Sequence, residues 1–502
     1  MKHKKIMTIL VVIIITAAVF SACDDEADED IQPTAAAVSH TGDIQIQEQE
    51  NELMQKITPD LPDYDLEGYA FRVFTMDWGD SPDWTIWNSR DITAEEETGS
   101  PVNDAVYKRN RILEEKYNFT IEQLSGTDRL NTLRTAVAAK DDYFDIITMG
   151  IRSNAAAAQE GLLVNLFDVS YLDFEKPWWD QGAAEGIGIG NKLFFSSGDF
   201  LLVNMDASPV ILFNKQLLTD LNLENPYELV QTNQWTLPKL YEMAKTAAAD
   251  LNGNGAMDMD TDRFGFVFSV DFSIFALMNG AGVRISGKDT DGLPVLSFGS
   301  DRDFSVASAV RELWRADFTW LQDGIIDMDP SLGDSGRAFA EGRGLFLGTN
   351  MRVIEQLRGM ETDFGILPLP RLNEQQAAYG HSISGIFGQT LAVPAFFDDD
   401  DILDKIGFML EAISAESRYT VIPAYYDVQL TGQLIRDEES REMLDIIFNS
   451  RVWDAGIIYD WVNFNMAMAV SAGTLASAWE SNLVRIENAM QTTVDTFENI
   501  VN

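Results

Sequence analysis

Cysteine and histidine are scarce in this sequence. Its 502 residues include one cysteine, Cys23, and three histidines. A single thiol excludes an intramolecular disulfide, a zinc site built from cysteines and an iron–sulfur cluster. One histidine stands at position 3 and another, His40, in a polar linker. A serine–histidine–aspartate or histidine–metal enzyme would therefore depend on His381 alone, and a structural role is expected for that residue.

Positive charge is also scarce. The chain has 36 lysines and arginines against 80 aspartates and glutamates, which gives a formal net charge of −44. Such a surface repels nucleic acid and anionic lipid head groups, so a nucleic-acid partner is not expected. Carboxylates are abundant enough to supply a catalytic pair, which leaves open an enzyme that acts on glycans. The same abundance prevents any one pair from being selected.

The first 23 residues predict export. A basic head that includes Lys4 and Lys5 precedes residues 6–20, which carry no charge, and small residues then lead to Cys23. Fifteen residues fall short of the roughly 20 that a membrane-spanning helix needs, so a cleaved signal peptide over residues 1–22 is favoured. The ending resembles a bacterial lipobox, although Phe20 stands where such boxes prefer Leu, Val or Ile. The resemblance implies lipidation of Cys23 and anchoring to the outer face of the cytoplasmic membrane.

The acidic segment at residues 23–61 predicts a self-repelling tether, because it contains no aromatic residue before position 61 and one lysine, Lys56. The rest of the chain exceeds the ~250–300 residues of a single core, which predicts two domains or lobes. Strand and helix patterns alternate along it and predict an α/β fold with largely parallel sheets. Expected strands cover residues 69–76, 118–124, 144–149, 192–196, 210–213, 264–269, 344–347, 363–367 and 389–393. Expected helices cover residues 102–117, 129–139, 154–160, 401–414, 438–448 and 473–499, with further helices starting at Lys215 and after an N-cap at Thr236.

Eight motifs follow one another along the chain. They are Tyr143-Phe-Asp-Ile-Ile-Thr-Met149, Gly161-Leu-Leu-Val-Asn-Leu166, Pro177-Trp-Trp-Asp180, Lys192-Leu-Phe-Phe195, Val210-Ile-Leu-Phe-Asn-Lys215, Trp235-Thr-Leu237, Asp250-Leu-Asn-Gly-Asn-Gly255 and Phe364-Gly-Ile-Leu-Pro-Leu-Pro370. Their order and spacing resemble the extracellular solute-binding proteins of family 1, the carbohydrate-binding components of ABC importers. The resemblance covers roughly residues 68–500.

This resemblance implies a type II periplasmic-binding-protein-like fold, in which two α/β lobes flank a hinged cleft. Lobe 1 is expected to comprise residues 62–207 and 389–433, and lobe 2 residues 208–388 and 434–502. The chain is expected to cross between the lobes near Asp206–Pro209 and to return near Gly385–Gln389. Closure of the lobes about this hinge would capture the ligand.

Open α/β sheets bind ligands at the carboxyl ends of their strands, which gives candidate ligand-binding residues. Aromatic rings stack on the C–H faces of a sugar, and charged or amide groups bond to its hydroxyls. A second aromatic cluster near position 453 adds one weaker candidate. Tryptophans 84 and 87 could equally pack a loop, and of Trp178 and Trp179 one is expected in the core and one in the cleft. The candidate ligand-binding residues are Trp78, Asp80, Arg152, Asp206, Asn350 and Trp453.

The segment at residues 250–262 matches the start of an EF-hand loop, with oxygen side chains at positions 1, 3, 5 and 9 and Gly255 at position 6. An acidic turn without metal is the alternative. Position 12 is Thr261, and related binding proteins suggest that Asp262 replaces it as a ligand. The predicted ligands of a structural calcium ion are Asp250, Asn252, Asn254, Ala256, Asp258 and Asp262.

The sequence as a whole predicts a monomeric, non-enzymatic lipoprotein that binds a carbohydrate, most plausibly an oligosaccharide, and delivers it to an ABC permease. No cofactor for chemistry is expected. The alternatives are a surface enzyme that acts on glycans through paired carboxylates, and an adhesin or sensor component with the same fold but no transporter. A peptide or metal-chelate ligand is a weaker option.

Overall fold

A computed structural model describes residues 56–500, except 79–84, 270–271, 322–332, 386, 398, 427–436 and 463. The predicted signal peptide, Cys23 and nearly all of the predicted tether therefore lie outside the described residues. Thr58–Asn502 form one compact unit.

The first of two main sheets has the strand order β12-β3-β1-β2. Its strands are β1 (Tyr69–Met76), β2 (Phe119–Gly126), β3 (Ile146–Gly150) and β12 (Gln389–Ala392). Strand β1 runs parallel to β2 and β3, whereas β12 is antiparallel to β3. Strand β3 is a short apolar run whose first four residues are buried, as expected for a strand covered on both faces.

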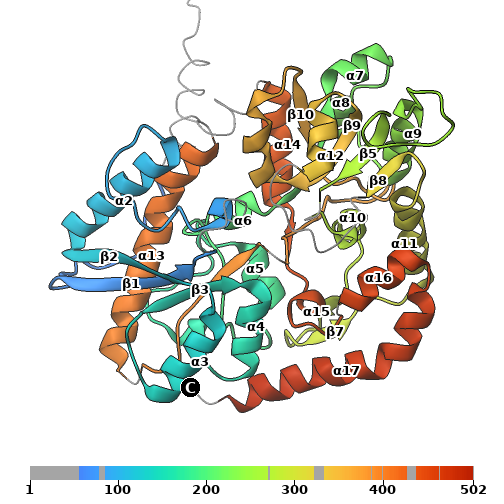
Figure 1. Ribbon diagram of the computed structural model, residues 1–502. Helices are drawn as coiled ribbons and strands as arrows, with labels where there is room; N and C mark the ends of the chain where they lie inside the picture. The colour runs from blue at the N-terminus through green and yellow to red at the C-terminus, as the bar shows by residue number, and fades with distance from the viewer. Residues whose placement is uncertain are drawn as a thin grey trace, which may run out of the picture. The chain divides into compact units, whose positions relative to one another are not determined.

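Two helices that are distant in the sequence pack together beside this sheet. Helix α13 (Asp400–Pro423) packs against α2 (Pro101–Tyr117), and the two lie side by side in Figure 1. The other elements in this part of the chain are η1 (Thr85–Trp87), α3 (Arg129–Ala139), α4 (Ile151–Gln159), η2 (Leu166–Asp168), α5 (Gln181–Ile187) and α6 (Val203–Asp206).

The second sheet has the order β10-β4-β9-β5-β8. Its strands are β4 (Pro209–Asn214), β5 (Phe264–Phe268), β8 (Thr319–Leu321), β9 (Gly344–Asn350) and β10 (Phe364–Leu367). Strand β5 is parallel to β8 and β9, whereas β4 is antiparallel to β9 and β10. The associated elements are α7 (Lys215–Asp220), α8 (Pro226–Gln231), α9 (Leu237–Ala247), α10 (Ile274–Gly280), β6 (Ser286–Lys288), β7 (Pro294–Leu296), α11 (Asp301–Trp314), α12 (Gly333–Ala340), η3 (Met351–Gly359) and α14 (Glu438–Asn449).

The C-terminal segment touches elements associated with both sheets. It contains β13 (Arg451–Val452), which pairs with β11 (His381–Ser382), and then α15 (Ala455–Ile458), α16 (Phe464–Ala472) and α17 (Leu475–Asn499). Helix α17 contacts α4 as well as α11 and α16. Its Phe497 ring lies edge-on to Phe194, 4.8 Å between centroids. The long helix α17 is the red helix at the bottom of Figure 1.

The predicted α/β class is confirmed, and β1 and α3 have the predicted bounds. Thr236 caps α9 as predicted, accepting a hydrogen bond from the Lys239 amide. The expectation of largely parallel sheets needs correction, because each sheet mixes parallel and antiparallel pairs. The predicted strand at 192–196 is wrong: this stretch makes only isolated bridges. Its apolar residues are buried, so the hydrophobic pattern reflects burial in the core and not hydrogen bonding in a sheet.

Both members of the tryptophan pair belong to the core, which corrects the expectation that one faces the cleft. Trp178 and Trp179 are buried, and both indole nitrogens donate to the carboxylate of Glu411 in α13, at 3.0 and 2.8 Å. Burial raises the pKa of Glu411 to about 7, against the lowering effect of the two indole donors. The pair therefore anchors α13 to the loop that precedes α5.

Among the described residues, no helix combines the length and apolar character that crossing a bilayer requires.

Candidate functional site

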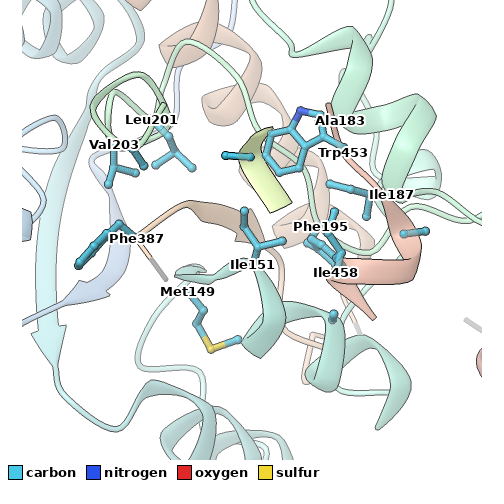
Figure 2. Close-up of a cluster of buried hydrophobic side chains, with 14 of the residues drawn as sticks. Met149, Ile151, Ala183, Ile187, Phe195, Leu201, Val203, Phe387, Trp453 and Ile458 are labelled. Atoms are coloured by element: carbon cyan, nitrogen blue, oxygen red, sulfur yellow. The ribbon is translucent and has the colours of Figure 1, made fainter. Parts of the chain in front are cut away.

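A small pocket lies where elements of both sheets and the C-terminal segment meet. It has a volume of about 30 Å³. That space accommodates about one water molecule. In Figure 2 the labelled side chains of Ile151, Trp453 and Ile458 lie near one another. The pocket is lined by Ile151, Arg152, Asn279, Ser382, Ile383, Gly385, Val452, Trp453, Asp454, Ile457 and Ile458.

A two-stranded ribbon brings two distant segments to this pocket. Strands β11 and β13 pair in parallel, with His381 opposite Arg451 and Ser382 opposite Val452. This register places Trp453 near Ile383 at the end of the ribbon. Asp454 then caps α15, accepting a hydrogen bond from the Gly456 amide at 3.0 Å and another from the Ile285 amide at 2.6 Å. Burial raises the pKa of Asp454, while these donors act to lower it.

A glycine in α5 allows the main chain at Trp453 to approach closely. A Cβ atom at Gly186 would lie 2.1 Å from the carbonyl oxygen of Trp453 and 2.7 Å from its Cβ. Contacts this short do not occur, so no larger residue fits without moving Trp453. Gly186 therefore fixes the depth at which the tryptophan sits in the pocket wall.

Two buried polar atoms of pocket-lining residues lack partners. The indole nitrogen of Trp453, a residue 5% exposed, and Oδ1 of Asn279, 2% exposed, make no hydrogen bond among the described residues. The amide nitrogen of Asn279 donates to the Val283 carbonyl, which fixes the orientation of the group. A buried polar group without a partner costs about 1–3 kcal/mol. Both atoms are buried within the wall and have almost no accessible surface, so they are not presented to the pocket in this structure.

Arg152 also lines the pocket, at the start of α4 and directly after β3. Its side chain is exposed, and it makes no hydrogen bond or ion pair within the described part of the chain. Two of the predicted ligand-binding residues, Arg152 and Trp453, therefore lie in the pocket lining, and ligand contact at both stays a prediction. The surface that these residues present to the pocket is almost entirely apolar.

Asp206 lies elsewhere, in a buried ion-pair network. Its carboxylate accepts hydrogen bonds from Arg90 at 3.0 and 2.9 Å and from the Tyr425 hydroxyl at 2.9 Å. Arg90 also pairs with Glu355 at 3.1 Å. Burial acts to lower the pKa of Arg90, but the two carboxylates outweigh it and raise that pKa. The carboxylate of Asp206 is thus engaged within the protein, and the residue is not among those that line the pocket.

The remaining sequence candidates are placed as follows. Trp78 packs against the core, with its ring 6.4 Å from that of Phe387. Trp87 stacks on the same Phe387 ring at 3.9 Å, which is the packing alternative considered for it. Asn350 is fully buried at the end of β9. Asp80 and Trp84 fall outside the described residues.

The predicted calcium loop is closed by its own side chains. Both carboxylate oxygens of Asp250 accept amide hydrogen bonds, from Gly253 and Gly255, and Asp262 accepts them from Leu251, Asn252 and Asp258. Burial acts to raise the pKa of Asp262, but these donors outweigh it and lower the pKa. Among the described residues, no group of three or more His, Cys, Asp or Glu side chains converges to hold a metal. In this structure the loop carboxylates bond to main-chain amides, and calcium binding by the predicted set of carboxylate, amide and carbonyl oxygens stays a prediction.

His381 has the structural role expected of it. Its Nε2 accepts the Leu369 amide hydrogen at 2.8 Å, and its Nδ1 lies 2.7 Å from the hydroxyl oxygen of Ser450. That hydroxyl donates to the Ile446 carbonyl, so Nδ1 carries the proton and the ring is neutral. Burial lowers the pKa of His381 to about 3, and the nearby charge of Arg284 acts in the same direction.

Asn279 and the residues of α15 are the site residues that sequence reasoning missed. Asn279 lies in α10, the first helix after β5, so the strand-end rule applied to β5 could have suggested it. Ile457 and Ile458 carry no such signal. They reach the pocket through the pairing of β11 with β13, two short segments 70 residues apart in the chain.

No family model matches the chain, and no curated protein matches it. Solved structures share its fold. A cyclo/maltodextrin-binding protein complexed with maltotetraose is 15% identical, with a TM-score of 0.53 over 85% of this chain and 99% of that chain. The maltose-binding periplasmic protein MalE from Listeria monocytogenes, in complex with maltose, is 13% identical, with a TM-score of 0.50 over 86% and 99% of the two chains. The chain therefore has the type II periplasmic-binding-protein-like fold, as predicted.

The close approach at Gly186 makes a first prediction. Gly186→Ala should lower the free energy of unfolding by about 1–3 kcal/mol, because the added methyl group overpacks the contact with Trp453. Urea unfolding of the full chain measures this. Gly359→Ala is the matched control, since a Cβ atom there meets nothing within 4 Å. Equal stability of the two variants would contradict the interpretation.

The neutral state of His381 makes a second prediction. The pKa of His381 in the folded state, about 3, lies below the ordinary value of 6.5. As the pH falls, the His381 side chain therefore becomes protonated in the unfolded chain at a higher pH than in the folded chain. Stability should therefore decrease below pH 6.5, by about 1.4 kcal/mol per pH unit relative to His381→Gln. Unfolding free energies measured between pH 7 and pH 4.5 test this, with His40→Gln as control. A difference between wild type and His381→Gln that is independent of pH would be the contrary result.

Proposed function

We propose that this protein is the substrate-binding component of an ABC importer and captures a carbohydrate at the pocket around Trp453. The observation that carries the proposal is the indole of Trp453 in the wall of a pocket at which elements of both sheets meet. Aromatic rings stack on the C–H faces of sugars.

The fold supports the same function. Both solved structures described above are sugar-binding proteins with a sugar bound, and this chain shares their fold at low identity. A pocket of about 30 Å³ is too small for a sugar, since ligand sites commonly measure about 300–1,000 Å³. The proposal therefore requires the two lobes to open about a hinge before a sugar can enter.

The proposal also places the protein at the outer face of the cytoplasmic membrane. Lipidation of Cys23 would anchor the chain outside the cytoplasmic membrane, and the acidic segment after it would hold the folded part away from the bilayer. An anchored binding protein stays close to its permease and acts as a monomer that delivers one ligand at a time. Mass spectrometry of the mature N-terminus tests the anchor: an unmodified Cys23 would contradict it.

Trp453 provides the direct test of the binding site. Trp453→Ala should weaken carbohydrate binding at least tenfold, because it removes the aromatic face. Trp453→Phe keeps a smaller aromatic face, so an intermediate loss is expected. Calorimetry with a panel of mono- and oligosaccharides measures both. Trp314→Phe is the control, since Trp314 packs on Phe268 and does not line the pocket.

The alternatives give different results in the same assay. Unchanged affinity in both Trp453 variants would show that the binding site lies elsewhere in the protein. Shortened glycans after long incubation would indicate an enzyme. Binding of amino acids or metal chelates in place of sugars would contradict the carbohydrate class.

We also propose a structural calcium ion at the loop of residues 250–262. If it binds, a chelator should lower the melting temperature of the protein, and calcium should restore it. Asp250→Asn removes a charge, keeps a side-chain acceptor for the turn and should abolish the response. A melting temperature that calcium and chelator leave unchanged, with no heat on titration, would show that amide hydrogen bonds alone close the loop.

A further inference from the structure

One ion pair joins segments of the chain that belong to different sheets. Arg90 lies between η1 and α2, on the side of the first sheet, and its guanidinium donates to the carboxylate of Glu355 at 3.1 Å. Glu355 lies in η3, which directly follows β9 of the second sheet. A second contact crosses at the same place, because Nε of Arg352 in η3 donates to the main-chain carbonyl of Ile86 in η1 at 2.8 Å. Side chains therefore connect the two sheets here, in addition to the chain segments that cross between them.

Each member of the Arg90–Glu355 pair has a second partner on its own side. Arg90 also donates to Asp206, which precedes the crossing into β4, at 3.0 and 2.9 Å. Glu355 also accepts a hydrogen bond from Arg352, three residues earlier in η3, at 2.9 Å. A large cost arises when a buried charge loses its last partner. Separation of Arg90 from Glu355 would leave neither charge alone, so this pair can break at a modest cost.

The Arg90–Glu355 pair is also partly open to water. The side chains of Arg90 and Glu355 are 26% and 25% exposed, whereas that of Asp206 is 8% exposed. Partly exposed charges attract each other weakly, because water and salt screen them. The contact between the sheets is therefore the weaker part of this network, and the contact within the first-sheet side is the more buried part.

We propose that the Arg90–Glu355 pair is a reversible latch that holds the two lobes in the closed arrangement and sets how often the pocket at Trp453 opens. This inference rests on the proposed function, which requires the lobes to open before a sugar enters. Neither latch residue lines the pocket. The latch would therefore control access through the population of the open form, without contact with the ligand.

Distance measurements between two spin labels test the latch in the full-length chain. The labels are attached at Glu115→Cys in α2 and Glu228→Cys in α8, two exposed positions associated with different sheets, and Cys23→Ser leaves these as the only thiols. Glu355→Gln keeps the size of the side chain and removes its charge. It should raise the ratio of the longer-distance to the shorter-distance population by about three- to fivefold, the effect expected for the loss of a partly exposed ion pair.

Glu341→Gln is the matched control. It removes a charge of the same sign, but the partner of Glu341 is Arg343, 2.6 Å away on the same side of the molecule. The control should leave the distance distribution unchanged. An equal response to Glu341→Gln and Glu355→Gln would overturn the latch, because net charge alone would then explain the opening.

Salt provides a second test that needs no change at Glu355. Sodium chloride between about 0.05 and 0.5 M should increase the longer-distance population of the chain with Glu355 intact, because screening weakens the pair. The Glu355→Gln variant should respond much less. A distance distribution that neither salt nor Glu355→Gln changes would overturn the latch.

Calorimetry of the same proteins with the panel of mono- and oligosaccharides separates this inference from the proposed function. Sugar binding together with distances that do not respond to Glu355→Gln would overturn the latch and leave the function intact. Distances that respond as expected, in a protein that binds no carbohydrate, would support the latch and contradict the function.

Discussion

The buried carboxylate of Asp206 is the contact on which the arrangement of this fold depends most. It lies at the end of α6, just before the chain enters the second sheet at β4, and it accepts hydrogen bonds from Arg90 and Tyr425. Arg90 follows β1 of the first sheet, whereas its other partner, Glu355, follows β9 of the second. Removal of one member of a buried ion pair costs about 3–5 kcal/mol, because the other charge is left unpaired. One short network therefore connects the two sheets near the point where the chain passes between them.

The limits of sequence reasoning are clear at this residue. The strand-end rule proposed Arg152, and the structure places this residue in the pocket lining, because a side chain that follows β3 directly has a position determined by local geometry. The same kind of reasoning proposed Asp206 and Asn350, which the structure places outside that lining. Ligand contact at these residues stays a prediction. A carboxylate near a crossing can serve a ligand or an internal arginine with the same chemistry. Only the location of Arg90, 116 residues away, decides between them.

Local patterns were read more reliably than long-range ones. The bounds of β1 and α3 and the cap at Thr236 follow from periodicity and capping over a few residues. The antiparallel placement of β12 beside β3 and the pairing of β11 with β13 depend on contacts between distant segments, which no single-sequence pattern specifies. The pocket is formed by such contacts between distant segments. Trp453 was proposed because it is aromatic, whereas Asn279 offered no feature beyond its place after β5.

The pocket and the ion-pair network differ in whether their polar and charged groups have partners within the protein. At Asp206, arginine, carboxylate and hydroxyl partners satisfy one another, so burial of the charges is compensated within the protein. At the pocket, the Trp453 indole, the Asn279 carbonyl group and Arg152 are left without partners among the described residues. The ion pairs at Asp206 therefore belong to the framework that connects the two sheets, whereas buried groups without partners occur at the pocket and at several other described positions.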